Sequence, residues 1–342
     1  MDTDRPIISF FCLPLSLKAV KFFRAFRPST HHENDEGFSG NGRGKEQFYL
    51  PPAASRFTIF CANQLTITTP VVQNFFMEAR QTTLSLEHPY GQTSAILTGP
   101  AEDTTSAVIL CHGFLSNKDS RTNIRLTELL TPKGFSTLRF DWFGMGDSSG
   151  RFADITVTAC LAQLESLLQD MNNRGYRDIG LIGGSFGGLL AILVAADHPE
   201  LFALGLKCPV PNFPEMLELE FGQDGITEWK RTNTIPNVTG GQDPIALNFE
   251  FYHDCHQFNA YAQAKKITSP CLIVHGEKDE LVPLHQIQRL AENLAGEKKL
   301  HFLPEANHHF GRPEDFRTMS LTLTDWMVAH VPTTPIASRA TP

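Results

Sequence analysis

The sequence GGSFGG at residues 183–188 constrains the fold of this chain more than any other feature. A short apolar run over residues 178–182 precedes it, and a longer apolar segment over residues 189–196 follows. The first pattern predicts a buried strand and the second a buried helix. A turn this tight between a strand and a helix leaves no room for side chains at its flanking glycines. The sequence therefore predicts a sharp strand-to-helix turn that presents Ser185 above the edge of a sheet.

Apolar strand patterns alternate with helical patterns along residues 77–331. A hairpin is predicted first, from strands at 82–87 and 93–98. Strands are then predicted at 107–111, 136–140, 178–182, 203–207, 271–274 and 299–303. Helices are predicted at 124–130, 155–171, 189–196, 284–294 and 313–330. Strands and helices that alternate through short connections form a mostly parallel sheet with helices on both faces. The predicted fold class is therefore α/β.

Residues 209–265 interrupt this alternation and hold many aromatic side chains. We expect them to form a small inserted cap, whose aromatic residues either line a substrate pocket or build the cap's own core. Residues 332–342 are rich in proline and threonine, and we expect a disordered tail there.

The first 76 residues differ in composition from the rest of the chain. They hold 11 of the 26 phenylalanines, and their net charge is +2 although the whole chain carries −8. We expect an N-terminal extension, disordered or translated from an upstream start codon, with Met77 as the natural start. A basic amphipathic helix or targeting arm is the competing interpretation.

Charge and cysteine content exclude several classes of protein. The pI of 5.9 and the lack of a basic stripe argue against a nucleic-acid partner. Seven scattered cysteines without a CxxC pair favour a reducing cytoplasm over a disulfide framework. The apolar run near the N-terminus is too short to span a bilayer, so no stable membrane insertion is expected. No metal site and no cofactor are predicted. The oligomeric state is left open, with a homodimer as one option.

A catalytic serine needs a base, and the base needs an orienting carboxylate. Asp279 follows the strand predicted at 271–274, and His308 follows the strand predicted at 299–303. We therefore assign Ser185 as nucleophile, His308 as base and Asp279 as its orienting acid. The sequence CHGF follows the strand at 107–111. We assign the oxyanion hole to the backbone N–H groups of Phe114 and Phe186.

These elements together resemble the α/β-hydrolase superfamily. Within it, residues 77–331 look like the esterases and the serine-aminopeptidase-like hydrolases. The run DWFGMGDSSG at residues 141–150 is similar to a structural loop of that group. EANHHF at residues 305–310 stands where the group carries GADHxF, which aligns His308 with the base. The resemblance implies a serine hydrolase that needs no cofactor.

The sequence predicts cleavage of small-molecule carboxylic esters through an acyl-enzyme intermediate. Amide, peptide or thioester cleavage on the same three residues is the alternative. An aminopeptidase would need an acidic anchor for the substrate amine, and Glu215, Glu218, Glu220 and Asp224 are candidates. A binding protein that has lost catalysis is a third reading, against which the complete set of three residues argues.

Overall fold

The structure, a computed structural model, describes residues 79–238 and 241–332. An eight-stranded sheet lies at the centre of these residues, in the order β1-β2-β4-β3-β5-β6-β9-β10. The bounds of its strands are β1 (Arg80–His88), β2 (Gly91–Gly99), β3 (Ser106–Cys111), β4 (Ser136–Phe140), β5 (Asp178–Gly184), β6 (Leu204–Lys207), β9 (Cys271–Gly276) and β10 (Lys298–Leu303). β1 and β2 form the predicted hairpin, and β2 also pairs antiparallel with β4. From β4 to β10 every pair is parallel. The mostly parallel α/β sheet is confirmed.

Helices cover both faces of the sheet. The helices of this layer are α2 (Arg121–Leu130), α3 (Val157–Asn173), α4 (Phe186–Ala195), α8 (Leu284–Asn293) and α9 (Pro313–His330), with short 3-10 turns η1 (Thr131–Lys133) and η2 (Phe152–Asp154). Alternate residues of β3 point to opposite faces, as the pleat of a strand requires. Val108 and Leu110 belong to the buried cluster that includes residues of α2 and α9, whereas Ala107 and Ile109 belong to the cluster that includes residues of α3, α4 and α8. β3 is buried along nearly its whole length, which explains its unbroken apolar run.

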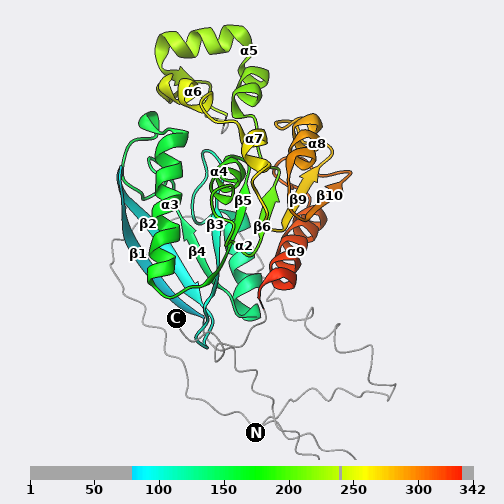
Figure 1. The fold of residues 1–342 in the computed structure, drawn as a ribbon. Coiled ribbons are helices and arrows are strands. Elements are labelled where there is room, and N and C mark those ends of the chain that lie inside the picture. The colour runs from blue at the N-terminus through cyan, green and yellow to red at the C-terminus, as the bar shows by residue number, and fades with distance from the viewer. Residues whose placement is uncertain (1–78, 239–240, 333–342) are drawn as a thin grey trace, which may run out of the picture. The chain divides into compact units, whose positions relative to one another are not determined.

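The chain between β6 and β9 forms a separate group of elements. They are α5 (Phe213–Thr232), β7 (Thr234–Ile235), β8 (Ile245–Ala246), α6 (Glu250–Cys255) and α7 (Ala260–Ala264). Figure 1 shows α5 and α6 at the top of the view, above the sheet and its flanking helices. Sequence patterns did not predict α5. Its periodicity is broken at Gly222, where φ is 65° and two helical pieces meet at a kink.

The predicted boundaries agree closely elsewhere. β4 and α9 have the predicted bounds, and α8, β9 and β10 differ by one or two residues at one end. α3 is displaced by two residues at both ends, and α2 and α4 begin three residues earlier than predicted. No helix of the described part of the chain is long and apolar enough to cross a membrane. The predictions for residues 1–76 lie outside the described residues, and so do those for the tail beyond residue 332.

Candidate active site

The parallel strands end at one edge of the sheet, and the sequence-predicted site residues follow those ends. Phe114 lies three residues beyond β3, and Ser185 directly follows β5. Asp279 lies on the loop after β9, and His308 lies on the loop after β10. The crevice outside the carboxyl ends of the strands is where open α/β sheets bind ligands. Topology thus brings together residues that are separated by up to 194 positions in the sequence.

Ser185 sits on a sharp turn between β5 and α4. Its backbone has φ 52° and ψ −116°, a conformation that L-residues rarely adopt. The glycines beside it are required by close contacts. A Cβ atom on Gly183 would lie 2.4 Å from the carbonyl oxygen of Gly187, and one on Gly187 would lie 2.2 Å from that of Cys111. The turn holds the half-buried Ser185 at the start of α4, where unpaired helix amides favour negative charge.

Asp279 and His308 form a buried pair. His308 Nδ1 lies 2.8 Å from Asp279 Oδ2, and both side chains are almost inaccessible to solvent. The other carboxylate oxygen accepts hydrogen bonds from the backbone N–H groups of Leu281 and Val282, at 3.0 and 2.8 Å. These bonds fix the carboxylate plane, so the aspartate can orient the imidazole ring. His309 is exposed.

The electrostatic environment favours an ionised Asp279 and a neutral His308. Burial acts to raise the pKa of Asp279, but the hydrogen bond and charge of His308 and the Val282 amide outweigh it, and the pKa falls to about 2. Burial lowers the pKa of His308, the Asp279 hydrogen bond raises it, and the nearby Lys207 ammonium lowers it further. A neutral imidazole can accept a proton from a serine hydroxyl.

Ser185, Asp279 and His308 lie at the same edge of the sheet, but a hydrogen bond connects only Asp279 and His308. Among the described residues, no hydrogen bond links the Ser185 hydroxyl to the His308 ring. Such bonds commonly tighten only when substrate binds. Gly113 approaches the turn closely, because a Cβ atom on it would lie 3.4 Å from Ser185 Cβ. The predicted oxyanion-hole residues Phe114 and Phe186 adjoin this contact, with ring centroids 5.6 Å apart.

Unusual backbone conformations cluster around these loops. Among the described residues other than glycine, five have positive φ. Four of them adjoin the site: Leu115 follows Phe114, Ser185 is the predicted nucleophile, Cys208 lies near Asp279, and Phe310 is two residues beyond His308. Strained residues of this kind persist where the surrounding structure over-determines them, and they cluster at functional sites.

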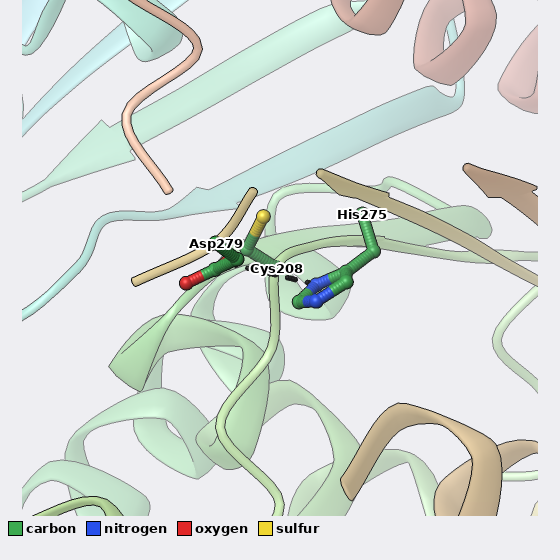
Figure 2. Close-up of side chains that lie close together, drawn as sticks. All are labelled: Cys208, His275 and Asp279. Atoms are coloured by element: carbon green, nitrogen blue, oxygen red, sulfur yellow. Dashed lines mark ion pairs between the residues drawn. The ribbon is translucent and has the colours of Figure 1, made fainter. Parts of the chain in front are cut away.

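A cysteine and a second histidine also face Asp279. Cys208 Sγ, His275 Nδ1 and an Asp279 carboxylate oxygen all lie within 4.8 Å of one another, and Figure 2 shows the three side chains gathered together. His275 Nδ1 is 3.7 Å from Asp279 and lacks a hydrogen-bond partner. Burial lowers the pKa of His275 to about 4 and raises that of Cys208 well above its ordinary value. These groups are ligand types for a metal ion, but the carboxylate is already bound by His308 and two amides.

The aromatic residues between β6 and β9 join the hydrophobic core of the sheet, and two of them, Phe258 and Tyr261, line a pocket. Phe213, Trp229 and Phe251 are fully buried, and the Phe114 ring lies 5.1 Å from Phe251 between centroids. A pocket of about 400 Å³ opens between α5, α7 and α8. Its lining residues are Pro211, Asn212, Pro214, Glu215, Glu218, His256, Phe258, Asn259, Tyr261 and Arg289. None of the predicted catalytic residues is among them.

The predicted amine anchors on α5 are already engaged or exposed. Glu215 Oε1 lies 2.6 Å from His285 Nε2, and Glu218 accepts a 2.5 Å hydrogen bond from the Tyr252 hydroxyl. Glu220 and Asp224 are exposed.

Sequence reasoning missed two residues of this region, Lys207 and Cys208. Lys207 is 8% exposed, and its ammonium donates a 2.8 Å hydrogen bond to the carbonyl oxygen of His308. A lysine at the end of the otherwise apolar run over residues 203–207 was the available signal.

A mostly parallel sheet with a serine on a strained strand-to-helix turn at its carboxyl edge defines the class: this is an α/β-hydrolase. The model of the prolyl oligopeptidase family matches residues 149–333, which is more than half of the chain, and the chain belongs to that family. It is a serine hydrolase, as the sequence predicted.

Three known proteins illustrate the likeness. The mitochondrial palmitoyl-protein thioesterase ABHD10 of Rattus norvegicus is 23% identical over 228 residues, which cover 64% of this chain and 74% of the relative. The serine hydrolase BPHL of Homo sapiens is 26% identical over 216 residues, covering 59% and 73%. The structure of Est1E from Butyrivibrio proteoclasticus with bound ferulic acid matches with a TM-score of 0.63 and 23% identity, over 72% of this chain and 98% of that one.

Proposed function

We propose that this serine hydrolase is a carboxylesterase that acts through Ser185, His308 and Asp279. The observation that carries the proposal is the buried 2.8 Å pair between His308 and Asp279, at the sheet edge where the strained turn presents Ser185. The three residues supply a nucleophile, a neutral base and an orienting carboxylate.

In the proposed reaction, His308 Nε2 accepts the proton of the Ser185 hydroxyl while Oγ attacks the ester carbonyl. The N–H groups of Phe114 and Phe186 donate hydrogen bonds to the oxyanion, and one such donor contributes about 3 kcal/mol to transition-state stabilisation. Asp279 stabilises the imidazolium. His308 then protonates the leaving alcohol and later activates the water that releases the acid.

Esters are favoured over peptides because the two partly buried candidate anchors for a substrate amine already have partners. Glu215 is bound to His285, and Glu218 is bound to the Tyr252 hydroxyl. The half-buried ring of Phe114, next to the turn that carries Ser185, offers an acyl chain an apolar contact.

Thioester cleavage is the second candidate, because the similar ABHD10 proteins are palmitoyl-protein thioesterases. A thioester has the same acyl part as an oxygen ester, and its thiolate leaving group needs less help from a proton donor. The two substrates therefore differ mainly at the leaving-group side of the site.

A fluorophosphonate probe and a substrate panel test both proposals. Wild-type protein should be labelled, Ser185→Ala should not, and Ser166→Ala on α3 should be labelled as wild type. The value of kcat/KM is then compared among aryl esters, acyl thioesters and aminoacyl anilides of matched acyl length. Anilide turnover above ester turnover would reject the carboxylesterase, and unlabelled, folded wild type would reject the catalytic serine.

We also propose that residues 77–331 form the hydrolase domain, with the cap inserted at about 209–265. The first described strand, β1, begins at Arg80, only three residues after Met77. A chain beginning at Met77 should therefore fold and hydrolyse esters like the full chain; aggregation of it would show that earlier residues belong to the domain. The cytoplasmic location and the homodimer stay predictions.

A further inference from the structure

Lys207, at the end of β6, is a buried basic residue that the proposed reaction does not use. Burial lowers the pKa of its ammonium, and the nearby Cys208, Asp279 and Glu280 act against this. Its side chain reaches the loop after β10, where the ammonium donates a hydrogen bond to the His308 carbonyl oxygen at 2.8 Å. The ammonium also lies 5.2 Å from the centre of the Phe310 ring. Among the described residues, no carboxylate lies within 4.0 Å of it. An ammonium with no carboxylate partner is costly to bury, so its position calls for an explanation.

The backbone of the same residue contacts the other side of the site. The N–H group of Ser185 donates a 3.0 Å hydrogen bond to the carbonyl oxygen of Lys207. One residue is therefore hydrogen-bonded both to the backbone of the predicted nucleophile and to the backbone of the predicted base. These contacts span 22 positions on one side and 101 on the other.

We propose that Lys207 is a positioning residue, which sets the separation of Ser185 and His308 and keeps the His308 ring neutral through its charge. This inference rests on the proposed function. Errors of about 1 Å in such a separation can cost on the order of 100-fold in rate. A lysine supplies both the reach of a long side chain and a charge near the base.

The sign of the charge effect follows from the groups that face His308. Asp279 contacts its Nδ1, Glu280 accepts a hydrogen bond from its backbone N–H at 3.1 Å, and His309 adjoins it. His275 of β9 also interacts electrostatically with it. Lys207 opposes protonation of the imidazole, whereas Asp279 favours it. Removing the lysine charge should therefore raise the pKa of His308, and the enzyme should lose activity at a higher pH.

The experiment compares Lys207→Met, Lys207→Arg and wild type by ester hydrolysis across pH. Lys207→Met should lower kcat by about 10- to 100-fold with KM nearly unchanged. The acid limb of its kcat/KM profile should move up by about 0.5 to 1 pH unit. Lys207→Arg keeps the charge and should keep the wild-type limb. Lys133→Met, an exposed lysine, is the matched control and should behave as wild type.

Thermal unfolding separates positioning from a merely structural role. Because Lys207→Met replaces a buried charge with an apolar chain of similar length, its unfolding midpoint should not fall. If this variant fails to fold, Lys207→Gln supplies a neutral hydrogen-bond donor and should show the same shifted limb. The inference is overturned if Lys207→Met or Lys207→Gln folds and has the wild-type kcat and pH profile. It is also overturned if the acid limb of the Lys207→Arg profile lies at the same pH as that of Lys207→Met.

The probe distinguishes failure of this inference from failure of the proposed function. If the fluorophosphonate probe does not label the wild-type protein at Ser185, the proposed function itself is rejected. Labelled and active wild type, with inactive Ser185→Ala and unaffected Lys207→Met, would reject the role of Lys207 alone.

Discussion

Replacing Asp279 by asparagine tests the proposed pair with the least change in shape. The two backbone amides of Leu281 and Val282 donate to Asp279 Oδ1. In Asp279→Asn these amides should hold the side-chain carbonyl oxygen in that place. The NH2 group must then occupy the place of Oδ2, which faces His308 Nδ1 at 2.8 Å. A donor in this position forces His308 Nδ1 to accept a hydrogen bond.

The forced tautomer carries its proton on Nε2, toward the nucleophile, where it cannot accept the Ser185 proton. In a serine protease, the corresponding change lowers kcat by about 10⁴-fold, which is about 5.5 kcal/mol of transition-state stabilisation. We expect a loss of that order here, because the structure fixes the orientation of the amide. The fold should be retained, since the substitution keeps the side-chain volume.

Steady-state hydrolysis of an aryl ester at neutral pH measures the loss, with circular dichroism as a check on folding. Asp147→Asn is the matched control: Asp147 is 80% exposed and pairs with Lys118, so kcat should stay near the wild-type value. Folded Asp279→Asn that keeps a tenth or more of wild-type kcat would refute the tautomer argument.

Three other changes have expected outcomes. His308→Ala should lower ester turnover on the order of 10³-fold or more, whereas His309→Ala should keep most of it because His309 is exposed; the opposite result would make His309 the base. Gly187→Ala should destabilise the fold by about 3 kcal/mol or more in urea titrations, since its Cβ atom would lie 2.2 Å from a backbone oxygen; Gly184→Ala, with a nearest contact of 3.7 Å, is the control, and equal stability would disprove the steric argument. Stability should fall as the pH is lowered from about 6.5 to about 4, because burial lowers the pKa of His112 and His275 to about 4 and the unfolded chain therefore binds more protons over this range. His275→Gln should flatten this slope in urea titrations at several pH values, and an unchanged slope would exclude His275 as a source.

Local sequence determined much of the architecture. The apolar runs of β3, β5 and β9 are short and continuous because both faces of the sheet are covered there, so each run was recognisable without knowledge of its partners. The turn at residues 183–188 was recognisable because it needs glycines. A Cβ atom at position 183 or 187 would lie only 2.2 to 2.4 Å from a backbone oxygen, so no other residue type fits there. By contrast, α5 was missed because Gly222 breaks its period within the helix.

The order of residues along the chain could propose Ser185, Asp279 and His308 as partners, since each follows a predicted strand. Only the tertiary structure places His308, rather than His309, on Asp279, because burial of one ring and exposure of its neighbour depend on packing. The same holds for Lys207, whose contacts to Ser185 and His308 cross from one strand to two neighbouring loops. The periodicity of a sequence indicates which face of a helix or strand is buried. It does not indicate a contact between residues 101 positions apart, such as that of Lys207 with His308.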